Sequence, residues 1–501
     1  MYYVEGHSRE QLIMFPESLD DYVVRNSLVC FIEEFVNGLD LVKLGFKYST
    51  PTVLGRHSYS PGDLLKLYLY GYHNYIRSSR RLEKETQRNV EVMWLLRKLT
   101  PDDKTIANFR KDNRKAMKKV FREFVIICRD LGLISGEILG VDGSKFRAQN
   151  SKDNNFSAKK LREKIERIDK QTETYLSEMD NNDDGEPPEA KLSVEEMNNK
   201  IEELKGRREK HEANLQKLEE SGESQLSLTD PESRLMKDKG RSDVCYNVQT
   251  VVDSKNKMIV EYDVTNHEND SNLLYEMSKS AKDSLGLKNP TILADSGYHD
   301  CNEIKKCVDD GMTVFLPHRS FPGGKNGLPL AGYHKEDFTY ISERNVYVCP
   351  CGFELTYAGI EKRPDKLVKV YKCSDFKECS GCSNCTGSKT GRKVRRWIHE
   401  EILEEMADRV SNNPAMMKKR KEICEHPFGT LKRGFGFGHF LTRGKEKTNA
   451  EMGLSALVYN IKRAIKILGF EALIEHLKTL RARLKTSINP LLTNEFCLKA
   501  S

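Results

Sequence analysis

Apolar residues between positions 60 and 131 recur every three to four residues, which is the spacing of amphipathic helices. The segment Thr100-Pro101-Asp102-Asp103 predicts a helix start, because a capping residue, a proline in the first turn and two acids suit a positive helix N-terminus. The helix that follows keeps its apolar face as far as Ile127. Basic residues lie on its other faces, so we expect an all-helical, basic domain over residues 1–135.

The pattern changes near residue 137, where short apolar runs alternate with turn residues. Residues 137–142 predict a strand that ends at Asp142-Gly143, and residues 246–253 and 258–264 predict a hairpin. Strands expected at 291–295 and 313–317 then alternate with helices expected at 271–284 and 300–310. This alternation is typical of a partly parallel sheet, so the fold class is α/β. Helices are expected again at 399–434 and 451–482.

A heptad pattern interrupts the predicted sheet between its first and second strands. Seam positions, most of them apolar, step alternately by four and three residues in two arms, one over 161–175 and one over 197–218. The segment between the arms, 180–188, contains Pro187-Pro188 and does not continue a helix. We therefore expect an antiparallel coiled-coil hairpin over residues 157–223.

Length and charge narrow the class of protein. A chain of 501 residues with 38% hydrophobic and 31% charged residues predicts a globular protein of several structural units. The net charge is +7, and several basic clusters favour a polyanionic partner, although any one cluster alone is more often a solvated helix face. No apolar run reaches the roughly 20 residues of a membrane span, and residues 1–6 lack the basic start and apolar run of an export signal, so we expect a cytoplasmic protein without a membrane partner.

Asp142 and Asp295 are candidates for chemistry, because each is expected at the end of an apolar strand. Taken singly, Asp-Gly and Asp-Ser-Gly are ordinary turn sequences. If the two strands are neighbours, however, the carboxylates converge and favour a hard cation such as Mg²⁺ or Mn²⁺.

Glu425 is a candidate third acid. Lys418, Lys421, Glu425 and Lys432 fall on one face of a predicted helix, which would place a metal ligand among phosphate-binding cations. Two alternatives stay open: an intrahelical salt bridge with Lys421, or an isolated acid on a DNA-facing helix. Pro427 predicts a kink or a restart of the helix near His426.

Three segments together resemble the DDE transposases of bacterial insertion sequences: Gly140-Val-Asp-Gly-Ser144, Ala294-Asp-Ser-Gly-Tyr298 and Glu425-His-Pro-Phe-Gly-Thr-Leu-Lys432. Further likeness lies at 78–80, 105–110 and 459–463, so the resemblance spans nearly the whole chain. It implies a catalytic domain of the RNase H-like type, a mixed sheet with flanking helices. On this basis we expect that domain over residues 136–156, 224–340 and 394–485, with the all-α domain before it and two insertions.

The resemblance implies that Asp142, Asp295 and Glu425 form a metal-binding triad and that Lys432 contacts DNA. The family's tyrosine and arginine before the glutamate are replaced here by Lys418 and Lys421, and Arg420 lies one place off. Glu422 shares roughly the face of Glu425, so the choice between them depends on the spacing to Lys432. The predicted DNA contacts are Lys418, Arg420, Lys421, Lys432, Arg433, Arg77 and Arg80.

The implied activity is transposition. Two ions of Mg²⁺ or Mn²⁺ would bridge the scissile phosphate, hydrolysis would free a 3′-hydroxyl at each element end, and that hydroxyl would attack target DNA. The partners would be double-stranded DNA and further copies of the chain, in a homodimer or a higher oligomer. Two other hypotheses remain: a nuclease without strand transfer, and a non-catalytic DNA-binding regulator.

A cysteine-rich segment over residues 341–393 forms the second insertion. Consecutive Cys-x-x-Cys steps at Cys379, Cys382 and Cys385, with Cys349 as a fourth thiolate, predict a structural zinc site; reduced, buried thiols are the alternative. Cys351 and Cys373 leave the ligand set ambiguous. Trp397, just beyond the segment, is more often a packing anchor than a base-stacking residue.

Overall fold

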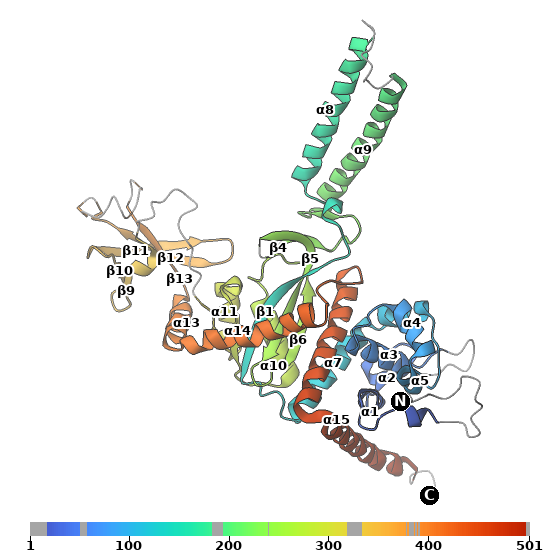
Figure 1. The fold of residues 1–501 in the computed structure, drawn as a ribbon. Coiled ribbons are helices and arrows are strands. Elements are labelled where there is room, and N and C mark those ends of the chain that lie inside the picture. The colour runs from blue at the N-terminus through green and yellow to red at the C-terminus, as the bar shows by residue number, and fades with distance from the viewer. Residues whose placement is uncertain are drawn as a thin grey trace, which may run out of the picture.

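A computed structural model gives the fold of the chain. It describes residues 18–50, 58–182, 194–238, 240–317, 333–376, 378–379, 385, 388 and 391–496. A mixed sheet lies at the centre, with a helical region at one side, a helical hairpin projecting from one end and a second, smaller sheet at the other side (Figure 1). The expected α/β fold, preceded by an all-helical region, is confirmed.

The N-terminal region is built from short helices packed on one another. Its elements are η1 (Leu19–Tyr22), α1 (Leu28–Asn37), α2 (Leu41–Leu44), α3 (Pro61–His73), α4 (Ser79–Arg88), α5 (Val90–Leu95), α6 (Asp103–Asp112) and α7 (Arg114–Asp130). The single helix expected from 101 to 127 is wrong, because Asn113 separates α6 from α7. Asp102, not Thr100, caps α6, and its carboxylate accepts the amide of Thr105 at 2.6 Å.

The central sheet contains β1 (Ile138–Arg147), β4 (Arg234–Asp238), β5 (Arg241–Asp253), β6 (Ile259–Thr265), β7 (Thr291–Leu293) and β8 (Thr313–Phe315). Its order is β4-β5-β1-β7-β8, and β6 pairs with β5. The pairs of β5 with β1, β4 and β6 are antiparallel, whereas β7 and β8 continue the sheet in parallel. The predicted hairpin and the partly parallel edge are both confirmed.

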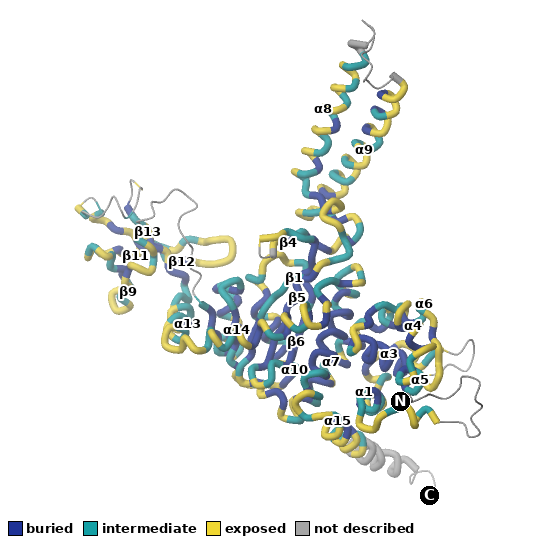
Figure 2. The backbone as a smooth tube through the Cα atoms, viewed as in Figure 1, coloured by how far each residue is buried: buried dark blue, intermediate teal, exposed yellow. Residues whose placement is uncertain are grey.

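Helices pack against this sheet and form one continuous core with it. α7, α10 (Leu274–Leu285), α14 (Pro414–Gly429) and α15 (Lys445–Phe496) contact its strands, and α11 (Cys301–Asp309) and α13 (Glu400–Asn412) contact β8. A single cluster of buried apolar residues runs from α1 through the sheet to α15. Figure 2 shows this core as the dark centre of the molecule, whereas the hairpin is largely exposed.

The insertion between β1 and β4 is an antiparallel pair of helices, α8 (Ala158–Asn182) and α9 (Val194–Ser221). Ion pairs from Arg162 to Glu219, at 2.9 Å, and from Arg208 to Asp169, at 2.7 Å, fix the opposite directions of the two helices. Much of the expected seam is buried between them, as shown by Leu161, Ile168, Met197, Ile201, Leu204 and Leu218. The tip at 183–193 lies outside the described residues.

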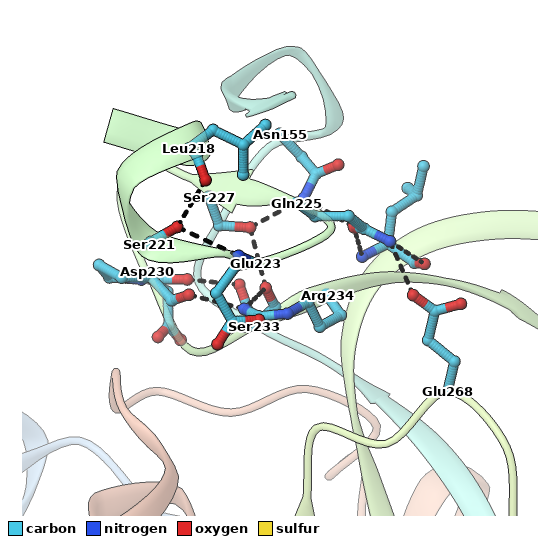
Figure 3. A network of polar contacts seen from close by, with 12 residues as sticks. Asn155, Leu218, Ser221, Glu223, Gln225, Ser227, Asp230, Ser233, Arg234 and Glu268 are labelled. Atoms are coloured by element: carbon cyan, nitrogen blue, oxygen red, sulfur yellow. Dashed lines mark hydrogen bonds and ion pairs between the residues drawn. The ribbon is translucent and has the colours of Figure 1, made fainter. Parts of the chain in front are cut away.

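A polar network fastens the base of this hairpin to the sheet (Figure 3). Two short strands, β2 (Asn155–Phe156) and β3 (Leu226–Ser227), pair there, and Asn155 donates to the Ser227 hydroxyl at 2.9 Å. Arg234 at the start of β4 pairs with Glu223 at 2.8 Å. Because Asn155, Ser227 and Arg234 are buried, the hairpin is anchored by specific hydrogen bonds as well as by apolar contact.

The cysteine-rich insertion forms an antiparallel sheet of its own. Its strands are β9 (Thr339–Ile341), β10 (Val346–Val348), β11 (Glu354–Lys362), β12 (Leu367–Cys373) and β13 (Lys393–Trp397). A separate small core, which includes Tyr347 and Tyr371, supports it. Trp397 is only 4% exposed, so it serves as a packing anchor and not as a free stacking surface.

The C-terminal helices cross the sheet and return to the N-terminal region. The expected restart near His426 is wrong, because α14 continues through Pro427 to Gly429. A π-helical turn over Thr430–Gly434 follows the end of α14. α15 changes direction at Gly469, whose φ is 79°. Within the described chain, no helix has both the length and the apolar character needed to cross a membrane.

Candidate active site

Strand register brings Asp142 and Asp295 together. The parallel pairing of β1 with β7 places Gly140 opposite Leu293, and the two aspartates lie two residues beyond that pair on their respective chains. The expectation that the first strand ends at Asp142 is wrong, since antiparallel pairing with β5 carries β1 on to Arg147, with Asp142 opposite Thr250. Asp295 does follow the end of β7, where its carboxylate caps a short turn by accepting the amide of Gly297 at 2.8 Å.

Arg420 of α14 lies against both carboxylates. Its Nη2 is 3.3 Å from Asp142 Oδ1 and 3.1 Å from Asp295 Oδ2. α14 approaches β1 closely here because residue 140 is glycine: a β-carbon at that position would lie 2.6 Å from Cys424 Sγ. The glycine of the Gly-Val-Asp segment is therefore required for packing, and it places the helix over the acidic pair.

The acidic pair carries more negative charge than one guanidinium neutralises. Burial raises the pKa of Asp142 to about 6, with Asp295 and Asp270 adding to the rise, while Arg420 and the amide of Gly143 oppose it. Burial alone would lower the pKa of Arg420, but Asp142 and Asp295 raise it, so that side chain stays charged. A cation between these two acids is therefore strongly favoured.

A third acid, Asp270, lies beside the pair and was missed from the sequence. Its Oδ1 accepts from Asn247, at 2.6 Å, and from Gln249, at 2.7 Å. A β-carbon at Gly143 would lie 2.7 Å from that oxygen, so the second glycine of the motif also permits close approach. Asp270 sits in a polar loop between β6 and α10, where nothing in the local pattern distinguishes it from a turn residue.

Tyr298 completes this network. Its buried hydroxyl donates to Gln249, and burial raises its pKa, with Asp270, Asp142 and Asp295 contributing. The Ala294–Tyr298 segment thus supplies both an acid for the pair and a buried anchor beneath it.

Glu425 remains outside the acidic pair. It is exposed on α14, next to Cys424, whereas the Nδ1 of His426 lies 2.9 Å from the hydroxyl of Tyr459. Across the described residues, no three His, Cys, Asp or Glu side chains are grouped so as to hold a metal ion. The triad of Asp142, Asp295 and Glu425 therefore stays a prediction, as does the preference for Glu425 over Glu422, which is also exposed.

Some of the predicted DNA contacts are exposed side chains, and others are bonded within the protein. Lys418, Lys421, Arg433 and Arg80 are exposed, and Arg80 reaches Asp103 at 3.4 Å. Lys432 instead ties the π-helical turn to β1, because its Nζ donates to Ser144 Oγ at 2.6 Å and to the carbonyl of Lys145 at 2.7 Å.

Arg77 differs from the exposed cations. It is buried, and its guanidinium donates to the carbonyl of His439 at 2.7 Å and to Glu451 at 3.2 Å. A DNA contact by Arg77 stays a prediction, and in this structure these bonds link the N-terminal region to the C-terminal part of the chain.

Among the cysteines that the structure describes, no three are grouped as a ligand set for a metal ion. Cys349 Sγ accepts the amide of Phe353 at 3.2 Å, and the Tyr333 hydroxyl lies 3.7 Å from Cys351 Sγ. Cys351 is foremost in raising the pKa of Tyr333, and Cys379 and Cys385 add to it. Cys382 lies outside the described residues.

Comparison with known proteins identifies two regions of the chain. Residues 17–112 match the family model described as Transposase domain (DUF772), and residues 348–465 match that described as Transposase DDE domain. The second match contains Glu425 and Lys432, whereas Asp142 and Asp295 lie outside it. No curated protein sequence matches the chain.

A search of solved structures matches a cryo-EM structure of a piggyBac transposase synaptic complex with hairpin DNA. The identity is 10% and the TM-score 0.30, over 92% of this chain and 80% of that one.

Proposed function

Since the chain belongs to the DDE transposases of the insertion-sequence type, we propose that it binds the ends of its own element and that it cuts and joins DNA strands at the Asp142–Asp295 pair. The observation that carries this proposal is the convergence of the two aspartates, from neighbouring strands, on one cationic group. Carboxyl ends of strands are where α/β sheets place ligands. The mixed sheet and its flanking helices are compatible with the RNase H-like type.

The donor set suits Mg²⁺ or Mn²⁺. Carboxylate oxygens are the ligands that these hard ions prefer, and the pair already accommodates a positive group between its oxygens. Asp142 and Asp295 would hold the metal, with Glu425 of α14 as the third ligand. Two such ions, when bound, would supply an activated water or 3′-hydroxyl and charge stabilisation at the leaving oxygen.

The remaining residues have separate roles in this proposal. Asp142 and Asp295 orient their oxygens toward the same space, because strand register and the Gly297 amide fix their positions. Exposed cations on and beyond α14, namely Lys418, Lys421 and Arg433, bind the DNA backbone. Lys432 holds the turn after α14 against β1, and a DNA contact by the same side chain would be made beside Ser144.

Zinc in the cysteine-rich sheet is a structural part of the proposal. Support comes from the amide of Phe353, which donates to Cys349 Sγ at 3.2 Å, and from the tight turn at Gly352, whose φ is 84°. Cys379, Cys382 and Cys385 supply the other predicted ligands.

The proposed assembly is a homodimer or a higher oligomer on double-stranded DNA, because two element ends must be cut and joined together. Its proposed location is the cytoplasm, in association with DNA.

Cleavage of a duplex that carries the element's own ends tests the function. With Mg²⁺, Asp142→Asn, Asp295→Asn and Glu425→Gln should each reduce strand cleavage by at least about a hundredfold while DNA binding and folding persist. Glu422→Gln is the matched control and should cleave normally.

Three results would contradict parts of this account. Loss of cleavage in Glu422→Gln instead of Glu425→Gln would move the third ligand by one turn. Cleavage unchanged in Asp142→Asn would refute the site, and a wild-type chain that binds but never cuts would favour the regulator.

A further inference from the structure

Arg420 lies where a shared cation of the acidic pair would lie. Its contacts with Asp142 and Asp295 are 3.3 and 3.1 Å long, and both are made by the same nitrogen, Nη2. The side chain is 14% exposed, so its charge depends on these acids more than on solvent. A divalent cation that used oxygens of both aspartates would have to displace or share this position.

The guanidinium is incompletely bonded. Arginine–carboxylate pairs are strongest when two nitrogens of the fork engage two oxygens of one carboxylate. Here a single nitrogen serves two different carboxylates, and the Nε of Arg420 is buried without a hydrogen-bond partner among the described groups. A buried donor without a partner costs about 1–3 kcal/mol, so this placement of Arg420 is less stable than one in which its Nε is hydrogen-bonded.

Two other arginines, Arg396 and Arg77, are bonded differently. Both terminal nitrogens of Arg396 bind the carboxylate of Glu404, in the two-nitrogen geometry. The Arg77 guanidinium reaches a backbone carbonyl, the ring of Phe437 at 4.5 Å and Glu451. The guanidinium groups of Arg396 and Arg77 are each held by several contacts. The Arg420 guanidinium contacts the two aspartates through one nitrogen.

We propose that Arg420 is an internal counter-ion that occupies the cation position of Asp142 and Asp295 in the DNA-free protein and is displaced when divalent metal binds. The proposal rests on the function given above and adds a regulatory step to it. Because α14 also carries Lys418 and Lys421 on its exposed side, a DNA phosphate near that helix would attract the released guanidinium. By thermodynamic linkage, DNA would then raise metal affinity, and metal would raise DNA affinity by the same factor.

The test is the affinity of the full-length, DNA-free protein for Mn²⁺, measured by calorimetric titration. Arg420→Gln should bind Mn²⁺ roughly tenfold more tightly than the wild type, because the competing charge is gone. Lys421→Gln removes the same charge from the next, exposed position and should change the affinity by less than about twofold. Arg420→Met, which keeps the aliphatic stem, has the same expectation should the glutamine variant fail to fold.

Thermal unfolding in EDTA confirms that each variant is folded before titration. Mn²⁺ affinity in folded Arg420→Gln and Arg420→Met that equals the wild-type value would overturn the proposal. Asp142→Asn separates this failure from failure of the proposed function. If that variant loses both Mn²⁺ binding and DNA cleavage while the Arg420 variants bind as the wild type does, the catalytic site stands and only the counter-ion role is refuted.

Discussion

Two acids of the same molecule, the buried Glu261 on β6 and the half-buried Asp142 on β1, have opposite electrostatic surroundings. Glu261 is 1% exposed and pairs with Lys118 at 3.3 Å and Arg122 at 2.9 Å, while Ser280 donates to it at 2.7 Å. Burial by itself raises the pKa of Glu261, but Lys118, Arg122 and the hydrogen bonds outweigh it, so its pKa is lowered. The pKa of Asp142, by contrast, is raised to about 6.

The difference separates a structural ion cluster from a functional one. Glu261 joins α7 to the sheet with two cations for one carboxylate, and its charge is fully compensated. At the Asp142–Asp295 edge two carboxylates share one guanidinium, with Asp270 close by. Uncompensated negative charge favours the binding of a further cation. The second cluster, and not the first, is therefore the candidate active site.

The largest expected effect on the free energy of unfolding comes from removing Glu261, the acid whose charge is compensated. Glu261→Ala leaves Lys118 and Arg122 without their partner at the α7–sheet contact, and should lower the free energy of unfolding by about 3 kcal/mol. Asp142→Ala in EDTA should cost far less, since it relieves repulsion with Asp295. Urea unfolding of both variants measures the contrast, and equal losses would show that the two clusters do not differ as described.

The pH dependence of stability should run in opposite directions at the two acids. Because the folded-state pKa of Asp142 is raised, the stability that its protonated form contributes is present below its ordinary pKa near 4 and is lost as pH rises toward 6. Asp142→Asn keeps the neutral form, so in EDTA it should match the wild type at pH 4 and exceed it by about 2 kcal/mol at pH 7.

Glu261→Gln provides the matched comparison. The lowered pKa of Glu261 means that its contribution is present above its ordinary pKa of 4.5 and is lost as pH falls through the lowered value. This variant should therefore be less stable than the wild type at pH 7 and approach it in acid. A pH-independent difference for both variants would contradict the assigned shifts.

A smaller loss of stability should follow from adding a side chain at Gly140, where α14, the helix that carries Arg420, packs on β1. Gly140→Ala would place a β-carbon 2.6 Å from Cys424 Sγ and should cost about 1–2 kcal/mol in unfolding free energy. Cys424→Ala removes that sulfur, so the double variant should recover part of the loss. Additive losses in a double-mutant cycle would show that α14 does not rest on Gly140.

The sequence predicted those parts of the fold that depend on local pattern. Short apolar runs between turn residues predicted β5, β6, β7 and β8, and the heptad pattern predicted the paired helices α8 and α9. Pairing between distant strands was not visible in the same way. β1 continues past Asp142 because β5 pairs with it, and the break at Asn113 interrupts an apolar pattern that continues through both α6 and α7.

At the candidate site, too, the local pattern predicted some features, and contacts between distant residues determine the others. Asp142 and Asp295 were predicted to converge from strand ends, and their register agrees with that expectation. Arg420 was expected to contact DNA, yet it faces the aspartates, since residue 420 lies on the buried side of α14 with Cys424. Asp270 is brought to the pair by the fold of a loop, a contact that no spacing in the sequence encodes.

Metal rescue of cysteine variants tests the central claim, that Asp142 and Asp295 are metal ligands, most directly. Asp142→Cys and Asp295→Cys should be inactive in DNA cleavage with Mg²⁺ and should regain activity with Mn²⁺ or Co²⁺, which accept thiolate ligands more readily. Asp309→Cys, on the surface of α11, should cleave normally with each metal. Full activity of Asp142→Cys with Mg²⁺, or no rescue of either variant by any of these ions, would contradict the account.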